Sequence, residues 1–297
     1  MIVRKSDRVL VQGMTGRQGT FWTERMQECG TTVVGGVSPS KGGTLHCGVP
    51  VFASTGEAMG VVGCDVAVLF VPPAGALDAA LAACEAGVKL LVVLTEHIPA
   101  LDVMRMHAAA RAGGTRIVGP NTAGLVTPGE AFVGIMPAFN ARVFQPGDVG
   151  VISRSGSLGT LVCLDLVRAG FGQSAFIGIG GDPMLGTTTR DALEALDRDE
   201  RTRAVVLVGE IGGAMEEAAA EYAAGMTKPV VSFIAGAASP PGKKMGHAGA
   251  IVEGGRGGYA AKRAALEAAG IVVTDTPNGI GEAMVARRAG RGPPIGA

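Results

Sequence analysis

Short apolar runs alternate with alanine-rich, amphipathic segments along most of the chain. In the first 120 residues, apolar runs predict strands at 8–12, 32–35, 66–70, 90–94 and 115–118. Segments rich in Ala, Leu, Met and Glu predict helices at 18–28, 55–62, 74–86 and 100–112. Continuous apolar strands separated by helices are typical of a parallel sheet covered on both faces. This half of the chain therefore predicts a doubly wound α/β domain.

The alternation stops between residues 126 and 148, where three prolines and no helical period predict a linker. It then resumes, with strands predicted at 149–153, 175–179, 204–208, 230–234 and 271–273. Helices are predicted at 158–169, 189–197, 215–224, 260–269 and 280–287. We therefore expect two doubly wound α/β domains, at 1–126 and 148–288, joined by a linker at 127–147, with a disordered tail at 289–297.

Composition narrows the choice of partners. Hydrophobic residues make up 47% of the chain and charged residues 18%, which excludes a disordered protein. Lys plus Arg and Asp plus Glu are equal at 26 each, so no broad basic surface for nucleic acid or an anionic membrane is expected. The five cysteines are scattered without a CxxC pair, which indicates a reducing compartment. With no signal-peptide pattern and no long apolar span, we expect a soluble cytoplasmic protein.

The first glycine-rich segment, VLVQGMTGRQGTF at 9–21, lies between a predicted strand and a predicted helix. Gly13, Gly16 and Gly19 permit a tight turn and the close approach of a ligand, and the helix N-terminus offers N–H groups to a phosphate. The spacing is GxxGxxG rather than the GxGxxG of dinucleotide-binding folds. We expect a phosphate-binding loop; a tight turn without a ligand is the alternative.

The second predicted strand ends in VVGGVSPSKGG at 33–43, without the Asp or Glu that an NAD-binding fold presents to the ribose. NAD is therefore disfavoured. Lys41 favours a ribose that carries a phosphate, as in NADP or in the 3′-phosphorylated nucleotide of coenzyme A. A solvated loop lysine is the alternative interpretation.

A serine-rich turn, in VGVISRSGSLGTL at 149–161, again joins a predicted strand to a predicted helix. Ser153, Ser155, Gly156 and Ser157 put hydroxyl and N–H groups at the start of that helix, which predicts an anion cradle. A GxSxG nucleophile elbow is absent, because Ser153 holds the position of the first glycine. A serine-rich N-cap without a ligand is the alternative.

The segment GKKMGHAGAIVEGG at 242–255 holds His247 between small residues, beside Lys243 and Lys244. Small neighbours make the imidazole accessible, and the lysines favour an anionic substrate. No other His or Cys lies close in sequence, so we expect no metal site. A neutral imidazole attacks phosphorus when an acceptor holds its other nitrogen, and Glu210, at the end of a predicted strand, is the candidate acceptor.

Eight segments occur in order along the chain: QGMTGRQGTF, VGGVSPSKGG, LTEHIP, GPNTAG, SRSGSLG, GIGGDP, GEIGG and MGHAGAI. Together they resemble the α-subunit family of succinyl-CoA synthetase (succinate–CoA ligase), from about residue 9 to residue 284. The resemblance implies an N-terminal Rossmann-like CoA-binding domain and a C-terminal flavodoxin-like ligase domain.

The resemblance also implies roles for individual residues. Coenzyme A would be bound by Thr15, Gly16, Arg17, Gln18, Lys41, Leu94, Thr95 and Glu96. His247 matches the phosphorylated histidine and Glu210 the carboxylate that steadies it. The turn formed by Ser155, Gly156 and Ser157 matches the helix N-terminus that receives the phosphohistidine, and Thr160 lies near the position of the acid substrate.

The family chemistry runs in three transfers. A β-subunit with an ATP-grasp fold phosphorylates the histidine from Mg-bound ATP or GTP, the phosphoryl group passes to a carboxylate, and the CoA thiol then displaces phosphate. No ATP-grasp domain fits into these 297 residues, so an αβ or α2β2 assembly is implied, with a dicarboxylic acid as substrate.

Three positions depart from the family pattern, at Thr160 (usually Tyr), Thr122 (usually Cys) and His97 (usually Gly). They leave the identity of the acid open between succinate, malate and another dicarboxylate, and some segments also resemble malate–CoA ligase small subunits. Two other functions compete with the ligase: a non-catalytic CoA-binding scaffold, and an NADP-dependent oxidoreductase that would leave the second domain unexplained.

Overall fold

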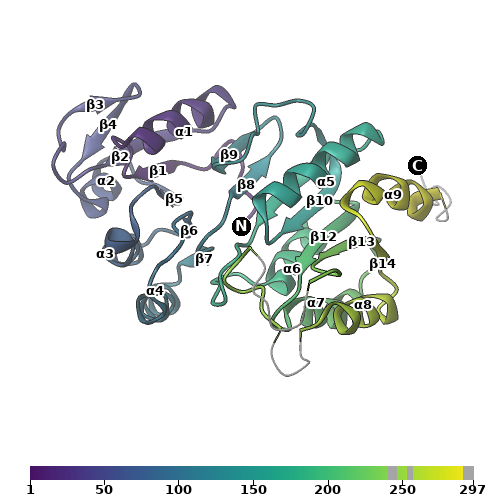
Figure 1. Cartoon of the computed structure of the whole chain (residues 1–297). Coiled ribbons are helices and arrows are strands. Elements are labelled where there is room, and N and C mark those ends of the chain that lie inside the picture. Colours follow the sequence, from purple (N-terminus) through teal and green to yellow (C-terminus); the bar gives the residue numbers. More distant parts are fainter. Residues whose placement is uncertain (240–245, 253–256, 290–297) are drawn as a thin grey trace. The chain divides into compact units, whose positions relative to one another are not determined.

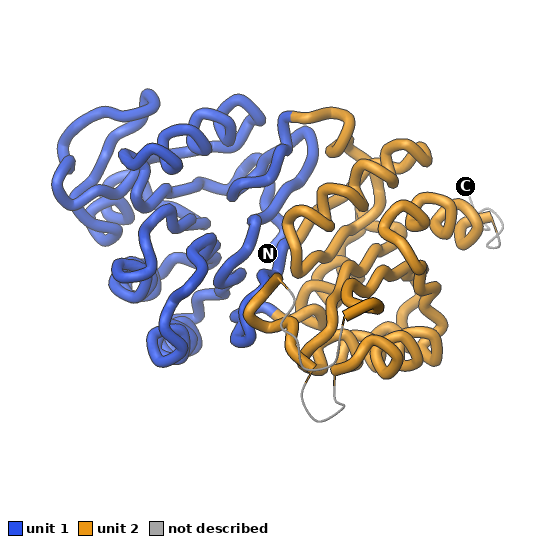
Figure 2. Tube along the Cα trace, viewed as in Figure 1, with its two compact units in different colours: residues 1–139, 178–187 blue, residues 140–177, 188–297 orange. Residues whose placement is uncertain are grey.

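The computed structural model describes residues 1–239, 246–252 and 257–289 (Figure 1). Lys243 and Lys244, and the predicted tail from residue 290 onward, lie outside the described residues. The chain forms two compact units (Figure 2): unit 1 is Met1–Phe139 with Gly178–Thr187, and unit 2 is Asn140–Ile177 with Thr188–Ala297. No helix in the described part of the chain has the length and apolar character needed to cross a membrane.

Unit 1 contains a seven-stranded sheet with the order β3-β4-β2-β1-β5-β6-β7. Its strands are β1 (Val9–Gln12), β2 (Val33–Val37), β3 (Leu45–His46), β4 (Val49–Phe52), β5 (Val66–Leu69), β6 (Leu90–Val93) and β7 (Arg116–Val118). All adjacent strands are parallel except β3 and β4. The chain proceeds outward from β1 on one side and from β5 on the other, so the strand order reverses between β1 and β5. Ligands of such sheets bind at this reversal, outside the carboxyl ends of the strands.

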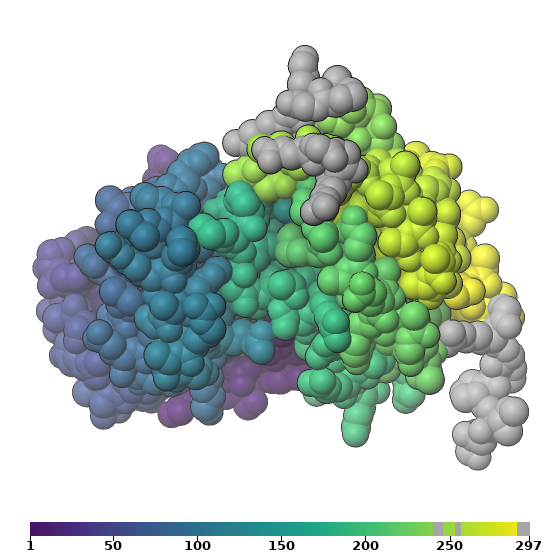
Figure 3. Space-filling model, turned by 90° about the horizontal axis from the view of Figure 1, so that it is seen from below, coloured from purple at the N-terminus to yellow at the C-terminus, as the bar shows by residue number. Residues whose placement is uncertain are grey.

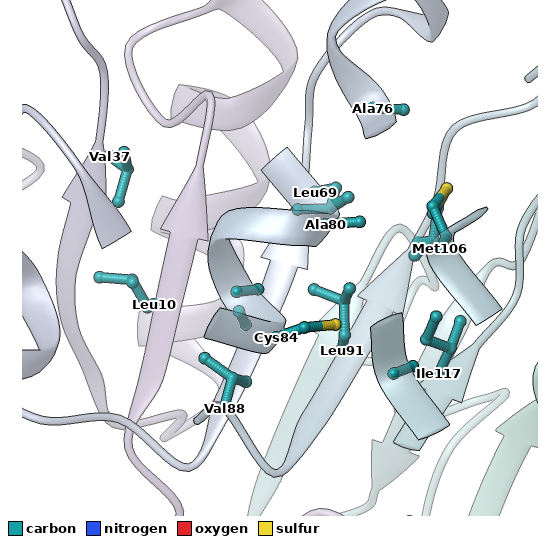
Figure 4. Close-up of a cluster of buried hydrophobic side chains, with 14 of the residues drawn as sticks. Leu10, Val37, Leu69, Ala76, Ala80, Cys84, Val88, Leu91, Met106 and Ile117 are labelled. Carbon is teal, nitrogen blue, oxygen red and sulfur yellow. The ribbon is translucent and has the colours of Figure 1, made fainter. Parts of the chain in front are cut away.

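The helices of unit 1 are α1 (Arg17–Glu28), α2 (Thr55–Val61), α3 (Pro73–Glu85) and α4 (Ala100–Gly113). Small residues let them pack closely: Ala76, Ala80 and Ala83 of α3 are fully buried, at the i, i+4, i+7 spacing of one helix face. They belong to the same core cluster as Leu69 and Leu91 of the sheet, in which Ala80 lies beside Leu69 (Figure 4). This core holds the carboxyl ends of β1 and β5 in fixed positions.

Unit 2 repeats the architecture with the strand order β14-β13-β12-β10-β11. Its strands are β10 (Pro146–Ser153), β11 (Gln173–Gly178), β12 (Ala204–Glu210), β13 (Val230–Ala235) and β14 (Val272–Thr274). Its helices are α5 (Gly156–Arg168), α6 (Thr189–Arg198), α7 (Met215–Ala223), α8 (Tyr259–Ala268), the 3₁₀ turn η1 (Pro277–Gly279) and α9 (Ile280–Ala289). The pairs β10–β12, β12–β13 and β13–β14 are parallel. Helices α7 and α8 contact each other (Figure 1). The part of the chain that holds them, green to yellow-green in the space-filling view, is exposed on the face shown in Figure 3.

The predicted fold class, two doubly wound α/β regions, is confirmed, and each predicted helix and strand is present with its ends shifted by at most three residues. The short strands β3, β4, β8 (Gly124–Thr127) and β9 (Ala131–Gly134) were not predicted. The expected linker at 127–147 contains β9, all four residues of which are buried in an antiparallel hairpin with β8. The β8–β9 hairpin was missed because its strands are only four residues long and because glycines and prolines interrupt the apolar pattern around them.

Candidate functional site

The serine-rich turn of unit 2 leads directly from β10 into α5. Ser155 is the N-cap of α5, and its Oγ accepts a hydrogen bond from the N–H of Leu158 at 3.4 Å. The Ser153 hydroxyl donates to the carbonyl oxygen of Ser155 at 2.6 Å, and the hydroxyls of Ser155 and Ser157 lie 3.2 Å apart. The turn is therefore held by its own hydroxyl groups, and Gly156 begins the helix.

His247 and Glu210 lie in direct contact, although 37 residues separate them in sequence. Glu210 is the last residue of β12, so its side chain lies at the carboxyl edge of the sheet. The distance from His247 Nδ1 to Glu210 Oε2 is 2.7 Å. Because a carboxylate only accepts hydrogen bonds, Nδ1 donates and the neutral ring keeps its lone pair on Nε2. The arrangement predicted from the sequence is thus formed.

A cavity of about 270 Å³ in unit 2 brings the predicted phosphoryl-transfer residues together. Ser155, Ser157, Glu210 and His247 line it, with Gly236 and Ala250 among the small residues of its wall. The Glu210 side chain is 8% exposed and that of His247 27%, so the carboxylate is withdrawn while the imidazole meets the cavity. The arrangement provides a nitrogen nucleophile, an acceptor that orients it and a helix N-terminus that favours negative charge.

In unit 1, two of the three glycines of the first loop are required by its backbone. Gly13 follows β1 with φ +79°, and a Cβ there would lie 2.5 Å from the carbonyl oxygen of Phe70. A Cβ on Gly19 would lie 2.3 Å from the carbonyl oxygen of Gly13. Gly16 is the N-cap of α1, and no side chain caps this helix. The loop therefore presents backbone N–H groups at the start of α1, as expected for a phosphate-binding turn.

The other predicted CoA-binding residues lie on loops, or in the first turn of α1, at the same sheet edge. Thr15 donates from its hydroxyl to Ser38 Oγ at 3.1 Å, while Arg17 and Gln18 are exposed in the first turn of α1. Lys41 is exposed in the loop after β2. Leu94, Thr95 and Glu96 follow β6, and the Thr95 hydroxyl donates to the carbonyl oxygen of Val71 at 2.8 Å, which holds this loop beside the one after β5.

A cavity of about 420 Å³ opens at this edge, where the strand order reverses. Gln12 and Gly13 line it from the end of β1, Ser38 from the end of β2, and Val71 from the end of β5. Its position follows the rule for ligand sites in doubly wound sheets. The predicted CoA-binding residues flank this cavity without being part of its wall.

Comparisons with known proteins show which family the chain belongs to. The profile of the CoA binding domain matches residues 4–97, and that of CoA-ligase matches residues 152–272. The chain is 48% identical over 282 residues to the ADP-forming succinate–CoA ligase subunit alpha 2 of Archaeoglobus fulgidus, covering 95% of this chain and 97% of that protein. It is also 48% identical over 280 residues to the corresponding alpha subunit of Methanothermobacter thermautotrophicus, covering 94% of each. The chain belongs to the succinate–CoA ligase α-subunit family.

A solved structure shows the same fold. The ATP citrate lyase of Methanosaeta concilii, in complex with (3S)-citryl-CoA, matches 100% of this chain with a TM-score of 0.86 and 23% sequence identity. The present chain spans 53% of that longer chain. At this identity the likeness concerns the fold, and it covers the whole of this member of the succinate–CoA ligase α-subunit family.

The structure also shows the surroundings of the three residues that depart from the family pattern. The Thr160 hydroxyl donates to the carbonyl oxygen of Gly156 at 2.8 Å and does not line the cavity of unit 2. Thr122 is buried, and its hydroxyl donates to the carbonyl oxygen of Gly178 at 2.5 Å. His97 has φ +62°, a conformation that favours glycine, which is the usual family residue here.

Arg154 is a site residue that the sequence analysis passed over. Its side chain is 2% exposed, and Nη2 lies 3.2 Å from Glu210 Oε1, on the carboxylate that contacts His247. In the sequence, Arg154 is a single arginine between two serines of a tight turn, and such a residue is normally exposed to solvent. A buried arginine requires a carboxylate partner, and only the fold shows that this partner is Glu210.

Proposed function

We propose that this chain is the α-subunit of an NDP-forming carboxylate–CoA ligase, in which His247 carries a phosphoryl group from a nucleoside triphosphate to a carboxylic acid. The observation that carries the proposal is the 2.7 Å contact between Glu210 and His247 at a cavity lined by Ser155 and Ser157. The names of the relatives in Archaeoglobus and Methanothermobacter support succinate as the acid. Malate or another dicarboxylate is the next choice.

In the first transfer, the lone pair of His247 Nε2 attacks the terminal phosphorus of the nucleoside triphosphate. The P–N bond forms as the bond to the bridging oxygen breaks, and the nucleoside diphosphate leaves with that electron pair. Glu210 accepts the Nδ1 hydrogen bond throughout, which stabilises the positive charge that develops on the ring. The N-terminus of α5 and the hydroxyls of Ser155 and Ser157 favour the transferred anion.

In the second transfer, a carboxylate oxygen of the acid attacks the phosphorus, the P–N bond breaks, and His247 recovers its lone pair. The product is an acyl phosphate. The thiol of coenzyme A then attacks the acyl carbon, inorganic phosphate leaves with the C–O electron pair, and the thiol proton passes to that phosphate. Division into covalent steps replaces one difficult condensation by easier transfers.

We assign the binding of coenzyme A to residues 1–126, and the phosphoryl chemistry to residues 148–288. The uncapped start of α1 and the exposed cations Arg17 and Lys41 fit the phosphates of coenzyme A, and the cavity at the strand reversal lies beside them at the same sheet edge. Contacts to this ligand are assigned to Thr15, Gly16, Arg17, Gln18, Lys41, Leu94, Thr95 and Glu96.

An α-subunit acts with a β-subunit, and we infer that the partner binds ATP or GTP with Mg. An ATP-grasp fold for that partner, an αβ or α2β2 assembly and a cytoplasmic location complete the proposal. The absence of a broad basic composition supports a small-molecule role rather than nucleic-acid or membrane binding.

A turnover assay tests this function. The chain, co-purified with its β-subunit, is given coenzyme A, Mg-ATP or Mg-GTP, and succinate or malate, and the thioester and released phosphate are measured. We expect equal amounts of both products, no turnover for His247→Asn, and a loss of about 100-fold or more for Glu210→Gln, since a misoriented ring presents the wrong nitrogen. Full turnover by His247→Asn would refute the proposal. Binding of coenzyme A without turnover of any acid would favour a CoA-binding scaffold.

A further inference from the structure

A line of charged side chains continues from Glu210 into the interior of unit 2. Arg154 Nη1 lies 3.8 Å from Glu216 Oε1, beyond the contact that Arg154 makes with Glu210. Lys262 Nζ lies 2.5 Å from Glu216 Oε2 and 2.9 Å from Glu217 Oε2. These residues come from β12, the turn before α5, and the adjacent helices α7 and α8 (Figure 1).

The inner members of this line are completely buried. The side chains of Glu216 and Lys262 are both 0% exposed, and that of Arg154 is 2% exposed. Glu216 and Lys262 occupy positions at which an amphipathic helix normally carries apolar residues: Glu216 shares its buried face with Ala219 and Ala223, and Lys262 lies one turn before Leu266. Buried ion pairs of this kind rarely stabilise a fold more than apolar residues of similar volume would. Their presence in the interior of unit 2 points to a task other than stability.

Glu216 has a second connection to the histidine site. Its Oε1 accepts a hydrogen bond from the backbone N–H of Glu210 at 3.3 Å. The Glu216 side chain lies against the backbone of Gly209, where an added Cβ would be 2.7 Å from Glu216 Cγ. Glu216 thus holds the main chain of Glu210 directly and faces its carboxylate through Arg154.

We propose that Arg154, Glu216 and Lys262 are positioning residues for His247. The inference rests on the proposed function, because it concerns the same histidine. Arg154 fixes the Glu210 carboxylate so that it meets Nδ1 of His247, which keeps Nε2 turned toward the cavity. Lys262 neutralises Glu216, so that Arg154 is shared with Glu210 instead of being drawn to Glu216 alone.

This arrangement predicts how charge changes behave in combination. In Lys262→Met, Glu216 loses its closest cation and competes with Glu210 for Arg154, so His247 loses its fixed acceptor. In the double variant Glu216→Gln with Lys262→Met, that competition is gone and Arg154 again pairs with Glu210. Lys228→Met is the matched control, since Lys228 is a half-buried lysine of unit 2 that donates to the carbonyl oxygens of Leu196 and Asp199.

The experiment measures two quantities on each full-length variant. The first is the rate constant for phosphorylation of His247 in the complex with the β-subunit, normalised to folded protein. We expect a loss of about 10- to 100-fold for Lys262→Met, a smaller loss for Glu216→Gln, and recovery to within about tenfold of wild type in the double variant. Lys228→Met should lower the melting temperature and leave the rate unchanged.

The second quantity is the tautomer of His247, read from the ¹⁵N shifts of its ring in the full chain without any substrate. We expect protonation at Nδ1 in the wild type and in the double variant, and a mixture of tautomers in Lys262→Met. Equal spectra and rates in all variants, with changes confined to melting temperature, would overturn the inference. If the wild type takes no phosphoryl group, the proposed function fails, while the tautomer still decides whether the buried charges position the ring.

Discussion

Each unit contains a turn that joins a strand to a helix, and in both helices a glycine of the first turn has no room for a side chain. In unit 1 the turn after β1 leads into α1, and in unit 2 the turn after β10 leads into α5. Both need a glycine in the first helical turn: a Cβ would lie 2.3 Å from a carbonyl oxygen at Gly19, and 2.5 Å from the ring of Phe176 at Gly159. At Gly19 the helix packs on the backbone of its own turn, whereas at Gly159 it packs on the Phe176 ring of β11.

The loops differ in what satisfies the helix N-terminus. No side chain caps α1, whereas Ser155 caps α5 and is itself held by Ser153. Behind α5 lies the buried line of charges that begins at Arg154, while Asp65 of unit 1 meets Arg8 and Lys89 at the surface. A helix N-terminus without a side-chain cap, as in α1, leaves its N–H groups available to a substrate that binds and dissociates. A capped N-terminus with buried charges behind it, as in α5, suits a residue that carries a covalent intermediate and must be held in position.

The largest effect on stability is expected at Gly19. In Gly19→Ala the new methyl group meets the backbone of Gly13 and Met14 at 2.3–2.9 Å, so the loop must move. We expect a loss of about 1–3 kcal/mol in the free energy of unfolding, together with weakened binding of coenzyme A. The matched control is Gly60→Ala in α2, where nothing lies within 4 Å of the added Cβ. Chemical denaturation and calorimetric titration with coenzyme A measure both; unchanged affinity in Gly19→Ala would show that this loop is not the CoA site.

Removal of a helix cap should have a smaller effect on stability and a selective one on function. Ser155→Ala removes the cap of α5, and Thr188→Ala removes the cap of α6, where Thr188 Oγ1 accepts from the N–H of Asp191 at 3.2 Å. Each should cost about 1 kcal/mol. Only Ser155→Ala should slow the phosphorylation of His247, because Ser155 lines its cavity. An equal slowing in both variants would assign the effect to stability instead.

The smallest effect is expected at the surface cluster of unit 1. The pKa of Asp65 is held below its ordinary value, mainly by the hydrogen bond from the backbone N–H of Arg8 and then by the side chains of Lys89 and Arg8. The folded state therefore binds fewer protons than the unfolded state. The contribution of Asp65 is therefore present above about pH 4 and is lost as pH falls through the folded pKa. We expect Asp65→Asn to cost less than about 1 kcal/mol at pH 7, and the difference from wild type to vanish in acid. A difference that persists at low pH would contradict the assignment.

The sequence was sufficient for most of the fold because the long central strands of both sheets are parallel and buried. Parallel strands read as continuous apolar runs, and the helices between them carry clear start signals, such as Ser54 before α2 and Thr188 before α6. The hairpin of β8 and β9 escaped because its strands are four residues long and rich in glycine at their ends, where Gly124 faces Gly134.

The candidate site was predictable to the extent that its motifs are local. His247 and Glu210 were paired from the sequence because Glu210 ends a predicted strand and His247 lies in a loop of small residues. Their contact, at 2.7 Å, is present in the structure. The buried charges behind them were not predicted, since Glu216 and Lys262 look like solvated helix residues when each helix is viewed alone. Their burial could have been inferred from their positions, since each lies on the face of its helix that otherwise carries apolar residues.

The most direct test of the central claim is the covalent state of His247. The chain, co-purified with its β-subunit, is treated with Mg-ATP or Mg-GTP without acid or coenzyme A, and its intact mass and the acid and alkali stability of the label are measured beside His247→Asn. The account predicts one phosphoryl group per chain, labile in acid and stable in alkali, that is absent from the variant. No label with either nucleotide in a stable complex, or equal label on the variant, would contradict it.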